Sequence, residues 1–192
     1  MRTLLSSLLT LTLLSGCDII DMPKSGQSGP VNPGSGVTRR VLLEDCTGPR
    51  CPNCPEAAEI AESIKDFYNT TEDRVIVVDI NMVDQFSAPE PPNYTTDFRT
   101  PAGYEYEQTF GIAALGLPRG LVDRKPYNGS MGIARTSWSS AVAQVIDLPA
   151  DMDLWFDSFN FNSTTNVVTA TVKVLTSSSE VPPAFVARAV MV

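Results

Sequence analysis

The feature that most constrains the fold of this chain is a pair of cysteines, Cys51 and Cys54, placed between an apolar run and an amphipathic segment. The apolar run at residues 41–43 predicts a buried strand, and a turn follows it. From residue 52 to residue 68, apolar side chains recur at three- and four-residue spacings, which predicts a helix with one buried face. The order strand, turn, Cys-x-x-Cys, helix therefore predicts a redox-competent cysteine pair.

The position of the two cysteines predicts a separate role for each. Free backbone N–H groups and the helix dipole stabilise negative charge at a helix start, so the pKa of a thiol falls there and its thiolate becomes a nucleophile. We expect Cys51 to be the exposed attacking thiol and Cys54, one helical turn away, to be the resolving thiol. Pro52 suits the first helical position, and Arg50 adds positive potential beside Cys51.

Two other uses of the cysteine pair stay open at this point. A Cys-x-x-Cys sequence in an exported chain also suits an inert structural disulfide. A zinc site would require two further ligands, but the chain contains no histidine and the folded part offers only Cys46 besides the pair. We therefore predict no metal and no cofactor, and we interpret Cys46 as a small buried side chain.

The rest of the chain predicts an α/β domain followed by strands. A β-branched run predicts a strand at 74–80, a proline-rich irregular segment follows at 81–102, and a short helix is expected at 103–110. Further on we predict a strand at 120–123 and a helix at 138–146. Together these elements place a domain at residues 38–148. Alternating apolar residues then predict strands near 154–161, 167–173 and 184–192, which we interpret as part of a β-sandwich at 149–192.

The N-terminal residues predict export and lipid attachment. Arg2 is followed by an apolar run and by small residues directly before Cys17, which is the pattern of a signal peptide. The run is too short to span a membrane. A cysteine at the cleavage point resembles the lipobox of bacterial lipoproteins, so we expect residues 1–16 to be removed and Cys17 to carry the lipid. Residues 17–37, rich in Ser, Gly and Pro, predict a flexible tether.

The charge balance and the missing histidine exclude several classes of function. The chain has 22 acidic and 14 basic residues, a net charge of −8. This acidic balance argues against nucleic acid and against an anionic membrane surface as partners. The absence of histidine excludes Ser-His and Cys-His nucleophiles. Chemistry in this chain must therefore use cysteines or carboxylates, or the chain acts by binding alone.

Further residues resemble the thioredoxin superfamily. Asp45 precedes Cys51 by six residues, and in that superfamily a carboxylate at this spacing lies beneath the resolving cysteine and accepts its proton. Leu117-Pro118 resembles the approach to the superfamily's cis-proline, which presents the preceding backbone to an extended peptide. The resemblance thus adds Asp45 to the catalytic candidates, and Leu117 and Pro118, with Arg50, to the substrate-binding candidates.

A longer motif is more specific. Glu44, Thr47, Gly48, the two cysteines and Pro55 resemble the Glu-x-x-Thr-Gly-x-x-Cys-x-x-Cys-Pro signature of the outer-membrane-protein-28-related lipoproteins of bacteria. That family joins a thioredoxin-like domain to a C-terminal β-sandwich. The resemblance implies a lipid-anchored protein of the cell envelope, in the outer membrane rather than the inner one.

Two functions are compatible with these residues. The first is a membrane-anchored thiol–disulfide oxidoreductase that acts on protein thiols and disulfides. The second is a non-catalytic surface or periplasmic binding protein that keeps the fold and a structural disulfide between Cys51 and Cys54. A carboxylate hydrolase built on Asp84, Glu90 and Asp97 is a more remote alternative, because acids in loops are normally solvated.

Overall fold

A computed structural model describes residues 38–150 and 152–176 of the chain. The predicted signal peptide at 1–16, the lipid on Cys17, the tether at 17–37 and the strand at 184–192 lie outside the described residues and stay predictions. Among the described helices, none combines the length and the apolar character that crossing a membrane requires.

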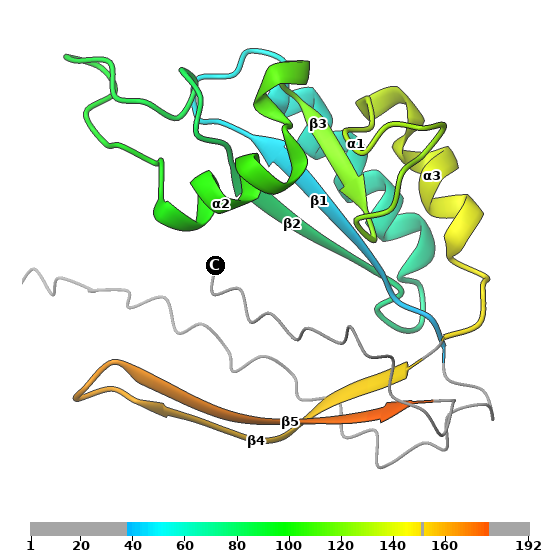
Figure 1. The fold of residues 1–192 in the computed structure, drawn as a ribbon. Helices are drawn as coiled ribbons and strands as arrows, with labels where there is room; N and C mark the ends of the chain where they lie inside the picture. Colours follow the sequence, from blue (N-terminus) through cyan, green and yellow to red (C-terminus); the bar gives the residue numbers. More distant parts are fainter. Residues whose placement is uncertain (1–37, 151, 177–192) are drawn as a thin grey trace, which may run out of the picture.

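A three-stranded mixed sheet forms the centre of the first part (Figure 1). Strand β1 (Val41–Thr47) lies between β2 (Val75–Asn81) and β3 (Arg119–Val122). It runs parallel to β2 and antiparallel to β3. Helix α1 (Cys54–Tyr68) makes the crossover that a parallel pair of strands requires.

Helices cover both faces of this sheet (Figure 1). On one face, Val41 and Leu43 of β1 pack in a core with α1 and with α3 (Trp138–Val145). On the other face, Cys46 of β1 belongs to a second, smaller core, against which α2 (Pro101–Phe110) packs. Because side chains alternate along a strand, residues 41, 43 and 45 share the α1 face, and residues 44 and 46 share the α2 face.

The helix starts differ slightly from the sequence predictions. Helix α1 begins at Cys54, not at residue 52, and Pro55 lies in its first turn, where no backbone N–H is required. Helix α2 begins at Pro101, two residues earlier than predicted, because the Thr100 side chain accepts a hydrogen bond from the Gly103 N–H at 3.0 Å.

A short return of the chain after β3 was not predicted. The backbones of Gly120 and Ile133 exchange two hydrogen bonds of 2.8 Å, which adds a single bridge beyond β3. The Trp138 ring packs directly on Gly120, where an added Cβ would lie 2.4 Å from its Nε1. The Trp138 Nε1–H donates to the Ile133 carbonyl at 2.9 Å. Gly120 thus allows the largest core side chain to lie flat on the sheet.

The second part is an amphipathic antiparallel hairpin of β4 (Met152–Asn162) and β5 (Val167–Thr176) (Figure 1). A register shift between Phe156 and Ser158 keeps apolar side chains on one face on both sides of the irregularity. That face is about half exposed and consists of Leu154, Phe156, Phe159, Phe161, Val168, Val172 and Val174. An apolar face of this kind is what part of a β-sandwich presents to its second sheet.

Candidate functional site

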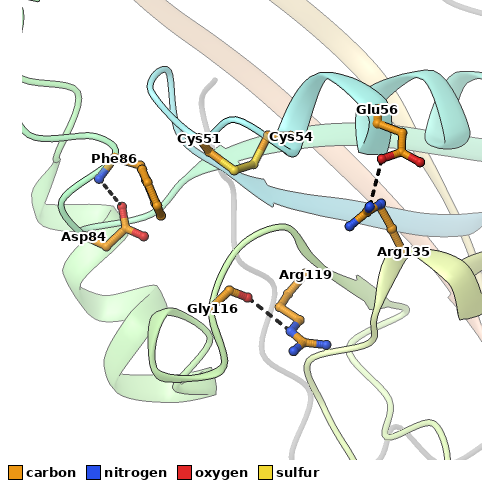
Figure 2. The surroundings of a disulfide bond; sticks show 8 residues. All are labelled: Cys51, Cys54, Glu56, Asp84, Phe86, Gly116, Arg119 and Arg135. Atoms are coloured by element: carbon orange, nitrogen blue, oxygen red, sulfur yellow. Dashed lines mark hydrogen bonds and ion pairs between the residues drawn. A yellow bond between two sulfur atoms is a disulfide. The ribbon is translucent and has the colours of Figure 1, made fainter.

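Cys51 and Cys54 form a disulfide at the start of α1, with their Cα atoms 5.4 Å apart (Figure 2). The Cys51 N–H donates to the Gly48 carbonyl at 2.9 Å, so the turn between β1 and α1 is closed by a backbone hydrogen bond. Both cysteines are buried: Cys51 is 5% exposed and Cys54 is 4% exposed. The sequence predicts an exposed Cys51, but in the structure its side chain is buried.

Residues 84–90, here called the cover segment, pack against the turn that carries Cys51. Figure 2 shows Asp84 and Phe86 beside Cys51. The Asp84 carboxylate accepts a hydrogen bond from the Phe86 N–H at 2.8 Å, which fixes the turn. Burial raises the pKa of the Asp84 carboxyl. The cover segment is the part of the predicted irregular segment that reaches the cysteine pair.

Arg50 connects the cysteine turn to the cover segment. Its backbone N–H donates to the Phe86 carbonyl at 3.1 Å, and its guanidinium donates to the Gln85 carbonyl and pairs with Glu90. The sequence predicts Arg50 as a substrate-binding residue. In the structure its guanidinium is used within the protein, and its side chain is 19% exposed.

Asp45 lies on β1, on the face that α1 covers, and is 1% exposed. Neither of its carboxylate oxygens has a hydrogen-bond partner. Burial, together with the charge of Asp79 at the paired position of β2, raises the pKa of Asp45 to about 7. A buried carboxyl with this pKa takes up and releases a proton near neutral pH, which is what a general acid or base requires.

The raised pKa of Asp45 predicts a pH-dependent effect of Asp45→Asn on stability. An unfolded aspartate ionises near pH 4, whereas the pKa of folded Asp45 is about 7. The buried carboxyl therefore lowers the stability of the fold progressively as the pH rises from about 4 to about 7, and it has no such effect below about pH 4. We expect Asp45→Asn to raise the free energy of unfolding by about 2–4 kcal/mol at pH 8 and to leave it unchanged at pH 4. Urea unfolding at both pH values measures this difference.

Asp97→Asn is the matched control for that experiment. Asp97 is exposed, and the Arg99 guanidinium lowers the pKa of its carboxyl to about 2, so it stays ionised at both pH values. Its replacement should therefore give no gain that appears only at pH 8. An equal effect of Asp45→Asn at pH 4 and pH 8 would show that Asp45 ionises normally in the folded protein.

The Leu117–Pro118 peptide bond is cis, and Pro118 is buried directly before β3. The loop before it is tied down by Arg119, whose guanidinium donates to the carbonyls of Leu115 at 2.9 Å and Gly116 at 3.1 Å. Figure 2 shows this loop on a different side of the disulfide from the cover segment. The structure thus brings two predicted parts of the site, the cysteine pair and the loop that contains Leu117 and Pro118, into one region.

A further ion pair, between Arg135 and Glu56 of α1, borders the same region at 2.8 Å (Figure 2). The three acids of the hydrolase alternative do not converge on one point. Glu90 pairs with Arg50, Asp97 pairs with Arg99, and Asp84 accepts from the backbone of the cover segment. These contacts give the acids structural partners and provide no pair of carboxylates for acid–base chemistry.

On the opposite face of the sheet, a buried cluster was missed by the sequence analysis. Glu44 is 2% exposed, pairs with Arg124 at 2.7 Å and accepts a hydrogen bond from the Tyr106 hydroxyl. Burial and the Glu44 carboxylate raise the pKa of Tyr106. No spacing in the sequence signals this cluster, because Arg124 follows β3 in a left-handed backbone conformation with φ of 51°. The cluster holds α2 against β1.

Cys46 lies on this same opposite face, as a buried free thiol. Burial, followed by nearby carboxylates, raises its pKa well above the ordinary range of a thiol. It therefore carries no thiolate at neutral pH and does not share a face with Asp45. In the parts of the chain that the structure describes, no three cysteine or carboxylate side chains come together as a metal site would require.

Comparison with known proteins gives one structural match. HBP35 of Porphyromonas gingivalis superposes with a TM-score of 0.53 and 21% sequence identity, over 74% of this chain and 44% of that chain. The described chain has a thioredoxin-like fold. The chain spans less than half of the length of HBP35. No protein-family model matches the chain, and no curated protein matches it.

The match confirms the predicted fold class, a thioredoxin-like α/β domain followed by part of a second, β-strand domain. At 21% identity the match concerns the fold alone. The disulfide between Cys51 and Cys54 is present at the start of the helix, as the motif predicts. The roles of individual residues rest on the geometry of the site.

Proposed function

We propose that this protein is a thiol–disulfide oxidoreductase that is exported and anchored to a membrane by lipid. The observation that carries the proposal is the Cys51–Cys54 disulfide at the start of α1, on the face of the sheet that holds the unpartnered carboxyl of Asp45. The helix start stabilises a thiolate on the attacking sulfur, and Asp45 supplies a proton acceptor that titrates near neutral pH. A disulfide with a purely structural role requires neither a position at a helix start nor a titratable carboxyl on the same face of the sheet.

The proposed reaction proceeds in two exchanges. In the reduced protein, the Cys51 thiolate attacks one sulfur of a partner disulfide, forms a mixed disulfide and releases the partner's other sulfur as a thiolate. Cys54 then loses its proton to Asp45 and attacks the Cys51 sulfur. This forms the Cys51–Cys54 disulfide and releases the second partner thiolate, so the partner is reduced and this protein is oxidised. The reverse sequence oxidises a partner dithiol.

The loop at residues 116–118 is the proposed docking site for the partner. The superfamily resemblance assigns to Leu117 the backbone that pairs with an extended peptide, and Leu117 is only partly buried. The Arg119 guanidinium fixes the loop through two carbonyls, so the peptide backbone there is preorganised. Leu117 and Pro118 thus act in binding and the cysteines in chemistry.

Catalysed exchange tests this function directly. The chain, in catalytic amount, is mixed with reduced glutathione and a peptide whose disulfide holds a fluorophore next to a quencher. If the protein is an oxidoreductase, the rate at which the fluorescence increases should rise in proportion to the protein concentration. A rate equal to that with glutathione alone would leave the disulfide as a structural feature.

The proposed anchor predicts the effect of Cys17→Ser. The small residues before Cys17 support lipid attachment there, and the family resemblance supports the outer membrane as its location. The unsubstituted chain, expressed in a bacterium with labelled palmitate, should carry the label and sediment with membranes. Cys17→Ser should lose the label and appear in the soluble fraction. Membrane association that persists in Cys17→Ser would show that something other than lipid anchors the protein.

A second candidate function is supported by a different observation. Cys51 is buried, and the hairpin of β4 and β5 carries a broad apolar face. A protein that binds a partner through the hairpin and keeps an inert disulfide would have both features. The exchange assay separates the two functions, because a binding protein gives no catalysed exchange.

A further inference from the structure

We propose that Arg50 is a positioning residue that holds the cover segment over Cys51 and thereby restricts which thiols and reductants reach the disulfide. This deepens the proposed function, since it concerns the selectivity of the same cysteine pair. Access to the disulfide is nevertheless measurable whether or not the protein is a catalyst.

The contacts of Arg50 carry the inference. Arg50 directly precedes Cys51, and it reaches the cover segment at three successive places: the carbonyls of Gln85 and Phe86, and the carboxylate of Glu90. The backbone contact to Phe86 needs no particular side chain, but the other two require a guanidinium of this length. The Arg50 side chain therefore joins the turn that carries Cys51 to the cover segment.

The cover segment is itself a braced unit. Ser87 is 1% exposed, and its carbonyl accepts a hydrogen bond from the Phe98 N–H at 3.0 Å. Gly48 lies so close to Phe86 that an added Cβ would come within 2.8 Å of the Phe86 Cβ. The absence of a side chain at Gly48 thus lets the cover segment pack directly on the turn that carries Cys51.

The consequence of this packing is a shielded nucleophile. Cys51 is 5% exposed, whereas an attacking or attacked sulfur must be approached in line with the S–S bond. Reaction therefore requires the cover segment to move or the partner to approach from the side of residues 116–118. The Arg50–Glu90 pair resists that movement, and because the Glu90 side chain is 65% exposed, the pair can be removed without unfolding the core.

Glu90→Gln is the variant that tests the proposal. It removes the ion pair but keeps the positive charge of Arg50 beside Cys51. The measurement is the rate at which an uncharged phosphine reduces the Cys51–Cys54 disulfide. The phosphine donates an electron pair, the disulfide becomes two thiols, and water supplies the oxygen of the phosphine oxide. An exposed ion pair contributes at most about 1 kcal/mol, so we expect a rate increase of roughly two- to fivefold.

The reduction potential separates access from electrostatics. If Glu90 acts by holding the cover segment in place, the rate of reduction rises in Glu90→Gln and the reduction potential of the cysteine pair is unchanged. The reason is that easier access speeds reduction and reoxidation of the disulfide equally. If Glu90 acts through its charge on the thiolate, the potential shifts with the rate. That second outcome would overturn the proposal, as would a Glu90→Gln rate equal to that of the unsubstituted chain.

Asp97→Asn is the matched control. It removes another exposed ion pair of the same irregular segment, between Asp97 and Arg99, which lies outside the cover segment. Its reduction rate should equal that of the unsubstituted chain. An equal rise in both variants would show general loosening of the segment and would contradict the specific role of Arg50. Failure of the exchange assay would leave these outcomes unaffected, since the phosphine reports access alone.

Discussion

Cys51→Ser should reduce catalysed disulfide exchange to the uncatalysed rate, because a hydroxyl at this position supplies no thiolate to attack a partner disulfide. Cys54→Ser should fail in a different way. It keeps the attacking sulfur but lacks the resolving one, so the first exchange takes place and the mixed disulfide with the partner accumulates. The two variants thus separate the nucleophile from the resolving thiol.

Non-reducing electrophoresis with a disulfide-bonded protein substrate measures both effects. A thiol-sensitive band at the summed mass is expected with Cys54→Ser and not with Cys51→Ser. Cys46→Ala is the control, because Cys46 is a buried free thiol on the opposite face of the sheet and should not be needed for exchange. A mixed disulfide formed by Cys51→Ser through Cys54 would reverse the assigned roles.

Trp138→Ala should destabilise the fold by about 3–5 kcal/mol, the usual loss when a buried tryptophan is truncated. Trp138 is fully buried, packs on Gly120 and donates its indole N–H to the Ile133 carbonyl. The alanine would leave a cavity between α3 and the sheet and would remove the indole hydrogen bond, while the Ile133 carbonyl keeps its bond from the Gly120 N–H. Since Gly120 pairs with Asp45 across β1 and β3, the cavity would also open beside the buried carboxyl.

Urea unfolding followed by circular dichroism measures this loss, and Trp138→Phe is its matched control. Phenylalanine keeps most of the packing and removes the hydrogen bond, so the expected loss is about 1–2 kcal/mol. A loss below about 1 kcal/mol for Trp138→Ala would mean that α3 contributes little to the core.

The elements of the α/β domain were predictable because their patterns are long and local. The amphipathic spacing of α1 and the β-branched run of β2 each identify an element, and the structure places both within about two residues of the prediction. Strand β1 is longer than the predicted run at 41–43, since Glu44 and Asp45 read as polar yet are buried. Tertiary contacts, which a local pattern does not contain, explain that difference.

The site was predictable only in part, for the same reason. Cys51, Cys54 and Asp45 lie within ten residues of one another, so a motif captures them together. The contacts of Arg50 with residues 85, 86 and 90, and those of Glu44 with Arg124, join residues 35 to 80 positions apart. Such contacts depend on how the irregular segments fold back, and no spacing in the sequence records them.

The reduction potential of the Cys51–Cys54 pair tests the central claim most directly. The purified chain is equilibrated across a series of glutathione redox buffers, and free thiols are trapped and counted by mass. An oxidoreductase should have a potential between about −270 and −120 mV, the range of thioredoxin-like catalysts. A potential below about −300 mV is that of a structural disulfide and would contradict the proposed function.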